Sequence, residues 1–225
     1  MTTTSTLLAP VLVKDDAILQ KDSEPFIFPD EYEGHLEGVL ISNQQIVERT
    51  NELAKAIREH YRSATNHKGI VLLNILKGSS VFCHYLMTAL SREKQLYDYD
   101  FIRVSSYKGL STTGDVKIQQ MSNLKETLEG NHVIVVEDIV DTGTTLSKLL
   151  PQIEREYHPL SVEVCSLLQK RTPAALACRI EPKFVGFSIP HVFAIGFGLD
   201  FNQLYRDLLD IWIISEKGIK HNGKF

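Results

Sequence analysis

Residues 132–145 read HVIVVEDIVDTGTT, an apolar run followed by acids, hydroxyls and one glycine. The apolar part does not alternate with polar residues, so it predicts a strand that is buried on both faces. Runs of this kind recur at Ile70–Leu76, Tyr99–Val104, His132–Val136, Ser161–Leu168, Val192–Ile195 and Ile211–Ile214. Gaps such as Ser79–Leu90 and Thr144–Tyr157 are long enough for crossover helices. The sequence therefore predicts an α/β protein with an open, mostly parallel sheet flanked by helices.

The polar half of the same stretch predicts a ligand site. Glu137, Asp138 and Asp141 place three carboxylates within five residues, and like charges this close are held for hydroxyls, cations or proton transfer. Thr142–Thr145 follow where a helix is expected to begin, and the unpaired N–H groups of a helix start bind phosphate. Lys77-Gly78 follows the first buried run and places a cation at the same edge of the sheet. We therefore expect a sugar phosphate to bind at this edge.

The composition is that of an ordinary globular protein. The chain has 225 residues, of which 43% are hydrophobic and 23% are charged, and this balance excludes disordered, collagen-like and disulfide-scaffold proteins. The formal net charge of −4 argues against general nucleic-acid or membrane partners, which need a surplus of Lys and Arg. The three cysteines form no C-x-x-C pair, and no apolar run approaches the ~20 residues that span a bilayer. We expect a cytoplasmic protein with reduced thiols.

The domain organisation is simple. Residues 1–22 are polar with scattered aliphatic residues and predict a mobile tail, and 23–225 predict one domain. The tetrapeptide Ser42-Asn43-Gln44-Gln45 matches a capping box, and the apolar spacing after it predicts a helix that runs to about Arg62.

The acidic string and its surroundings resemble the binding motif for phosphoribosyl diphosphate (PRPP) of type I phosphoribosyltransferases, and in particular the hypoxanthine-guanine members of that family. Further matching segments are Ile75–Gly78, Asp100–Tyr107, Ser111–Asp115, Lys170–Pro173 and Gly198–Asn202. The resemblance extends from about Phe26 to Gly218. It implies the type I fold with a small hood region. It also implies a purine salvage glycosyltransferase that converts hypoxanthine or guanine with PRPP to IMP or GMP and pyrophosphate.

The resemblance also implies a role for individual residues. PRPP would be bound by Lys77, Gly78, Ser106, Tyr107, Glu137, Asp138, Asp141, Thr142, Gly143, Thr144, Thr145 and Arg206. The purine would be bound by Lys170, Phe193, Ala194 and Asp200, and the expected cofactor Mg²⁺ by Glu137, Asp138 and Asp200. Asp141 would be the catalytic acid or base at purine N7. Lys170 would donate to purine O6, which explains a preference for 6-oxopurines over adenine. Ser106 and Tyr107 would begin a closing lid that ends at about Lys117, and the Lys77-Gly78 bond would be cis in some states.

Other functions fit the sequence less well. Gly196-Phe197-Gly198 begins like a dinucleotide fingerprint, but Phe201 stands where its third glycine belongs. Asp141-Thr142-Gly143 alone suggests an aspartic protease, yet no second Asp-Thr-Gly is present. The eight histidines lack zinc-ligand spacing, and there is no nucleotide-hydrolysing P-loop.

The strongest rival is a regulator that senses PRPP and acts on nucleic acid without catalysis. Such a protein needs a basic face, which the net charge of −4 opposes. The expected partners are therefore small-molecule substrates, without nucleic acid or membrane. The family implies a homodimer or homotetramer, and the sequence leaves open whether xanthine is a substrate.

Overall fold

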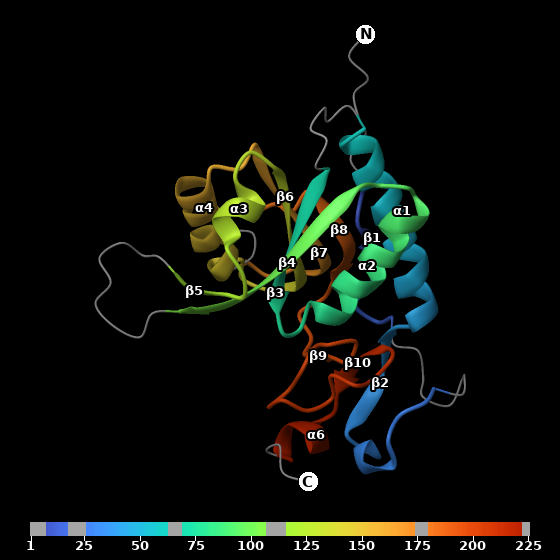
Figure 1. Cartoon of the computed structure of the whole chain (residues 1–225). Helices are drawn as coiled ribbons and strands as arrows, with labels where there is room; N and C mark the ends of the chain where they lie inside the picture. The colour runs from blue at the N-terminus through green and yellow to red at the C-terminus, as the bar shows by residue number, and fades with distance from the viewer. Residues whose placement is uncertain (1–7, 18–25, 63–68, 107–115, 174–179, 222–225) are drawn as a thin grey trace.

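The fold consists of one large sheet between helices and a smaller sheet beside it (Figure 1). The computed structural model describes residues 8–17, 26–62, 69–106, 116–173 and 180–221. The large sheet contains β1 (Val11–Leu12), β3 (Ile70–Leu76), β4 (Tyr97–Ser106), β5 (Val116–Gln120), β6 (His132–Val140), β7 (Ser161–Lys170) and β8 (Phe184–Ile189). Its spatial order is β1-β8-β7-β6-β3-β4-β5, and neighbouring strands are parallel except for β4 and β5. The predicted open, mostly parallel sheet is confirmed.

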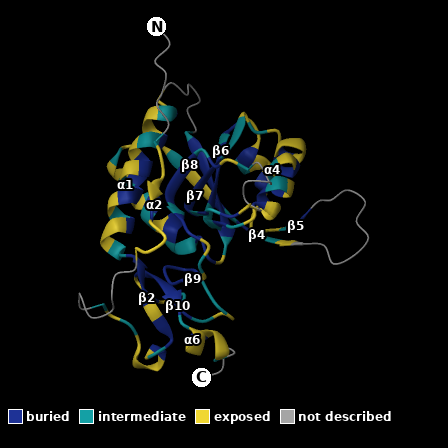
Figure 2. Cartoon of the chain, turned by 180° about the vertical axis from the view of Figure 1, so that it is seen from behind, coloured by how far each residue is buried: buried dark blue, intermediate teal, exposed yellow. Residues whose placement is uncertain are grey.

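Helices cover both faces of this sheet. α1 (Asn43–His60) and α2 (Ser80–Arg92) lie on one face, and α3 (Leu124–Leu128) and α4 (Thr144–Tyr157) lie on the other (Figure 1). Side chains of β3 alternate between the two resulting cores: Ile70 and Leu72 join the first, and Val71 and Leu73 join the second. Both faces of the central strands are thus apolar, which is why the sequence shows uninterrupted runs. The outer helix surfaces are exposed while the sheet between them is buried (Figure 2).

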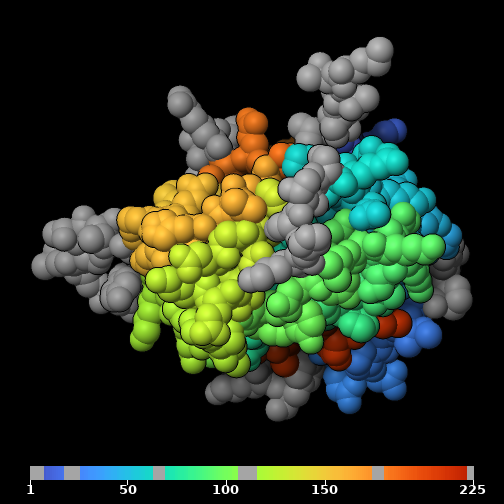
Figure 3. Space-filling model, turned by 45° about the horizontal axis from the view of Figure 1, so that its top comes forward, coloured from blue at the N-terminus to red at the C-terminus, as the bar shows by residue number. Residues whose placement is uncertain are grey.

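The smaller sheet forms a hood beside the carboxyl ends of the large sheet's strands. It contains β2 (Leu36–Ile41), β10 (Ile211–Ile214) and β9 (Ala194–Ile195), in that order. The 3-10 helix η1 (Asp30–Tyr32) and α6 (Glu216–Lys220) flank it. Its core is built around the fully buried Trp212. The centre of the Trp212 ring lies 5.5 Å from the ring centres of Phe26 and of Phe28, and both pairs are edge-to-face. In the space-filling view, the two helical layers occupy opposite sides of the molecule (Figure 3).

Most local predictions are confirmed, with differences in extent. β3, β10 and α4 have the predicted bounds, and the capping box of Ser42 and Gln45 starts α1. The predicted lid segment, which was expected to run to about Lys117, already contains the start of β5 at Val116. Among the described residues, no helix is both long and apolar enough to cross a membrane. Cys83 and Cys165 are buried free thiols, and Cys178 lies outside the described residues.

The N-terminal segment differs from its prediction. A mobile tail was expected over residues 1–22, but Val11–Leu12 pair in parallel with β8. Two arginines account for the order of residues 8–17. Arg49 donates to the Ala9 carbonyl at 2.5 Å, and Arg171 donates to the Val13 carbonyl at 2.8 Å. The expectation of a tail is therefore wrong for 8–17, because side chains far along the chain satisfy its backbone carbonyls.

Candidate active site

The candidate site lies where three neighbouring strands end. β7, β6 and β3 are adjacent and parallel, so the turns after them meet at one edge of the sheet. β3 leads to Lys77 and Gly78, the last residues of β6 include Glu137 and Asp138 and lead to Asp141, and β7 ends at Lys170. The hood brings Phe193, Asp200 and Arg206 to the same edge. The topology therefore gathers residues from four distant parts of the sequence.

The turn between β6 and α4 forms a pocket suited to a phosphate. Gly143 stands directly before α4 with a φ of 74°, a left-handed conformation that favours glycine. Thr142 and Thr144 are exposed, and their hydroxyls hydrogen-bond each other at 2.9 Å. The adjoining cavity of about 110 Å³ is lined by Glu137 and by residues 139–146. Threonine hydroxyls and the first residues of the helix thus line a space that can hold a phosphate group.

Glu137 and Asp138 form a half-buried acidic pair. Burial, and after it the charge of Asp138, raises the pKa of Glu137 well above its usual range. Burial likewise raises the pKa of Asp138 to about 6, against hydrogen bonds from backbone N–H groups and the nearby charge of Arg206. Glu137 Oε2 is buried and has no hydrogen-bond partner among the described residues. Such a pair is stabilised when hydroxyl donors or a cation approach it.

The acidic pair also fits a divalent cation. Carboxylate oxygens are the ligands that Mg²⁺ prefers, and it is usually held by one or two carboxylates together with substrate oxygens. Within the part of the chain that the structure describes, no group of three or more His, Cys, Asp and Glu side chains could hold a metal by itself. The residues present therefore suit a metal that enters together with an anionic ligand.

Asp141 and Lys170 face each other across a second cavity. Lys170 Nζ lies 2.9 Å from Asp141 Oδ2, and the side chain of Lys170 is 9% exposed while that of Asp141 is 47% exposed. Lys170 Nζ also lies 5.9 Å from the centre of the Phe193 ring, and this ring is exposed. The cavity measures about 200 Å³ and is lined by Asp138, Ile139, Asp141, Lys170, Phe193, Ala194, Leu199 and Asp200. An exposed ring beside a donor and an acceptor suits a planar heterocycle.

The turn after β3 packs closely against the acids and the hood. A side chain at Gly78 would overlap the carboxylate of Asp138, and one at Gly198 would overlap the carbonyl of Gly78. Arg206 binds Asp200 at 2.6 Å and the Gly198 carbonyl at 2.6 Å. This corner combines the guanidinium of Arg206 with the exposed Lys77, and two cations suit an anion.

The cis peptide bond is displaced from its predicted place. The resemblance implied a cis bond at Lys77-Gly78, but the structure has it at Leu76-Lys77, directly after β3. The prediction was wrong by one bond, since motif matching locates the turn and does not distinguish neighbouring bonds within it.

The structure gathers nearly all of the predicted site residues at this edge. Ser106 ends β4, and Tyr107 lies outside the described residues. Sequence reasoning assigned no role to Gly198 or Leu199, although both touch the site. The signal was present for Gly198, because a glycine in a matched segment indicates a close backbone approach.

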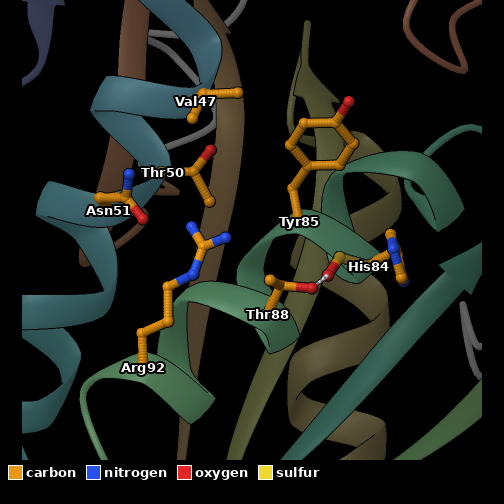
Figure 4. Close-up of a pocket in the computed structure, with 7 residues that line it drawn as sticks. All are labelled: Val47, Thr50, Asn51, His84, Tyr85, Thr88 and Arg92. Carbon is orange, nitrogen blue, oxygen red and sulfur yellow. Dashed lines mark hydrogen bonds between the residues drawn. The ribbon is translucent and has the colours of Figure 1, made fainter.

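A larger cavity lies away from these residues. It measures about 240 Å³ and opens between α1 and α2, with Thr50 and Asn51 on α1 and Tyr85 and Arg92 on α2 (Figure 4). None of the residues that line it is an acid or belongs to the matched segments. The chemistry therefore places the candidate site at the strand ends and not in this groove.

Comparison with known proteins identifies the family of this chain. The family model described as "Phosphoribosyl transferase domain" matches residues 40–202. Human hypoxanthine-guanine phosphoribosyltransferase is 39% identical over 216 residues, which cover 93% of this chain and 95% of the human protein. The rat enzyme of the same name is 40% identical over 220 residues, covering 95% and 97%.

A solved structure gives the same result. A hypoxanthine phosphoribosyl transferase from Trypanosoma cruzi superposes with a TM-score of 0.73 at 34% identity, covering 85% of this chain and 97% of that one. The family model, the two relatives and this structure all point to the same family. The chain therefore belongs to the phosphoribosyltransferase family, among its hypoxanthine-guanine phosphoribosyltransferases.

Proposed function

We propose that this protein transfers the phosphoribosyl group of PRPP to N9 of hypoxanthine or guanine, giving IMP or GMP and pyrophosphate. The observation that carries the proposal is the pair of Asp141 and Lys170, 2.9 Å apart, beside the exposed ring of Phe193. A 6-oxopurine has an acceptor at O6 and a neighbouring nitrogen at N7 that exchanges a proton. Lys170 can donate a hydrogen bond to O6, and Asp141 can exchange a proton with N7.

The purine enters the cavity of about 200 Å³. Phe193 stacks on the base, Lys170 donates to O6, and the backbone at Ala194 and Asp200 meets the edge of the base. Adenine carries a 6-amino donor in place of the 6-oxo acceptor. Two donors then face each other, and adenine is rejected by several kcal/mol.

PRPP occupies the adjoining pockets. Asp141, Thr142, Gly143, Thr144 and Thr145 surround the 5-phosphate, and Glu137 with Asp138 accepts the ribose hydroxyls. Lys77, Gly78 and Arg206 hold the pyrophosphate, and Ser106 with Tyr107 belongs to the loop that closes over it. As pyrophosphate leaves, C1 of the ribose gains positive character. Asp141 exchanges the proton at N7 and thereby eases the attack by N9.

The proposed metal is Mg²⁺. Glu137, Asp138 and Asp200 are the residues that would hold it, directly or through water, and the orphaned Oε2 of Glu137 supports the assignment. When bound, the metal supplies positive charge to the pyrophosphate leaving group. The chain itself orients the sugar, stacks the base and exchanges the proton.

We propose further properties of the whole chain. Residues 23–225 form a single catalytic domain that assembles as a homodimer or homotetramer. The odd number of cysteines without a C-x-x-C pair supports a reducing compartment, so the proposed location is the cytoplasm. The net charge of −4 supports partners that are small molecules and not nucleic acids.

A single kinetic comparison tests the function. Purified protein is given PRPP and Mg²⁺ with hypoxanthine, guanine, xanthine or adenine, and pyrophosphate release is measured. We expect turnover with hypoxanthine and guanine and none comparable with adenine, while the xanthine arm decides that substrate. A regulator that only senses PRPP would bind it without releasing pyrophosphate, and that result would overturn the proposal.

A further inference from the structure

Asn74 is a polar residue in the middle of an apolar strand. It belongs to β3, and both it and Ser79 have no exposed surface. The Ser79 hydroxyl hydrogen-bonds the Asn74 side chain and the Ile75 carbonyl, while Asn74 Nδ2 has no partner among the described residues. Burying an amide with an unpaired N–H costs more than one hydrogen bond returns. The pair is therefore expected to serve something other than stability.

The Ser79 side chain does not cap the N-terminus of α2. It stands immediately before α2, where a serine hydroxyl normally accepts from an N–H of the first helical turn. Here the hydroxyl makes no such bond and turns back toward the end of β3. The start of the helix is thus tied to the strand it follows. The tie closes a short loop that contains only Leu76, Lys77 and Gly78 between Ile75 and Ser79.

The closed loop leaves little freedom to the turn it contains. Ser80 strengthens the closure, because its hydroxyl donates to the Lys77 carbonyl at 2.7 Å. A side chain added at Gly78 would overlap the carboxylate of Asp138, and one added at Gly198 would overlap the carbonyl of Gly78. A small shift of the loop would therefore move Lys77 and the backbone groups of Gly78 relative to Asp138.

We propose that Asn74 and Ser79 are positioning residues that hold the Lys77-Gly78 turn in the conformation that binds pyrophosphate. Neither residue touches the ligand, and both act through the backbone of the turn. The inference rests on the proposed function for the identity of the anion. What it adds is that the buried hydrogen bond between Ser79 and Asn74 determines the position of the Lys77-Gly78 turn.

The test separates position from stability. Ser79→Ala removes the tie and leaves the Asn74 carbonyl oxygen without its donor, so it lowers both the melting temperature and pyrophosphate affinity. The double variant Asn74→Leu with Ser79→Ala replaces both polar groups with apolar ones of similar size, which restores stability. A matched control is Thr50→Val, which removes a buried hydroxyl bonded to the Ile46 carbonyl at 2.7 Å on α1.

Pyrophosphate binding is measured by calorimetry with Mg²⁺, and turnover of guanine with PRPP is measured separately. We expect the Kd for pyrophosphate and the KM for PRPP to rise about tenfold or more in both site variants, with the KM for guanine unchanged. Thr50→Val should change neither constant. If the double variant regains stability and wild-type affinity together, or if Ser79→Ala binds pyrophosphate as wild type does, the inference is wrong. Wild-type protein that binds pyrophosphate without turning over guanine contradicts the proposed function alone.

Discussion

At the scale of single residues, Asp141 and Lys170 are each other's partner. The ion pair keeps a nearly buried ammonium compensated, since Lys170 is only 9% exposed. In the proposed complex, Lys170 donates to purine O6 and Asp141 meets N7, so each side chain keeps a polar partner. We therefore expect the same two side chains to contribute both to stability and to recognition of the base.

The first prediction concerns Asp141. Asp141→Asn keeps the size of the side chain but cannot exchange a proton, so kcat should fall by about 10²-fold or more. The KM for PRPP should change less, because the phosphate loop around Thr142–Thr145 keeps its geometry. Steady-state kinetics with guanine measures both constants. A kcat within about threefold of wild type would mean that positioning alone carries the catalysis.

The second prediction concerns the stability that the protein loses when Asp138 is ionised. Burial raises the pKa of this carboxyl to about 6 in the folded protein, so between about pH 4 and 6 the folded chain holds more protons than the unfolded chain. The free energy of unfolding therefore falls as the pH rises through that window. Above the window, the Asp138 carboxyl is ionised in the folded protein and destabilises it fully. Asp138→Asn removes the cost and also relieves Glu137, whose pKa the charge of Asp138 raises.

We expect Asp138→Asn to raise the melting temperature by a few degrees at pH 8 and by much less at pH 4.5. The same variant should bind PRPP more weakly, because it loses an acceptor for the ribose or the metal. Thermal unfolding at the two pH values measures the first effect. Asp98→Asn, a change at an exposed carboxylate, is the control. An equal shift at both pH values would disprove the assigned cause.

At the scale of elements, the turn between β3 and α2 gives the third prediction. Gly78 is not needed for its backbone angle, because it is not among the residues with positive φ. It is needed for space, since a side chain there would overlap Asp138. Gly78→Ala should therefore raise the KM for PRPP about tenfold or more by displacing the turn.

The control for this change is Gly130→Ala. Gly130 has a φ of 67° and no atom within 4 Å of the added carbon, so alanine there is strained but meets no neighbour. It should cost about 1 kcal/mol of stability and leave the KM for PRPP unchanged. Kinetics and thermal unfolding on both variants separate steric displacement from backbone strain. Equal KM values for Gly78→Ala and wild type would contradict the packing argument.

The elements also explain why part of the fold was predictable. β3 and α4 were predicted with their observed bounds, because one is an uninterrupted apolar run and the other an amphipathic helix after a glycine. β8 was missed because Gly186 interrupts its apolar run, and a side chain at Gly186 would overlap the Leu167 carbonyl of β7. A contact with a neighbouring strand thus determines that glycine, and no local pattern reveals it.

In the candidate site, too, some features follow from the local sequence and others depend on contacts between distant segments. The acids and the phosphate loop lie within one short segment, so their proximity could be predicted from the sequence. The pairing of Asp141 with Lys170 joins residues 29 positions apart, and only the adjacency of β6 and β7 brings them together. The hydrogen bond of Ser79 to Asn74 was also hidden, because a serine before a helix predicts a cap.

At the scale of the whole molecule, the last prediction concerns the negative charge of the protein, which opposes the binding of an anionic substrate. The net charge is −4, and the site itself contains Glu137, Asp138 and Asp200, while Arg206 is already bound to Asp200. PRPP adds several negative charges to this acidic edge, and Lys77 with Arg206 cannot neutralise them alone.

We therefore expect a divalent cation to be required for binding PRPP and not for folding. Excess EDTA should abolish turnover, and added Mg²⁺ should restore it, while the melting temperature of the ligand-free protein stays unchanged. PRPP should raise the melting temperature only when Mg²⁺ is present, because the ligand binds the folded state as a metal complex. Full turnover in EDTA would show that the basic side chains are sufficient. A loss of stability in EDTA without ligand would instead indicate a metal held by the protein alone, although no group of three or more His, Cys, Asp and Glu side chains in the described ranges could hold one.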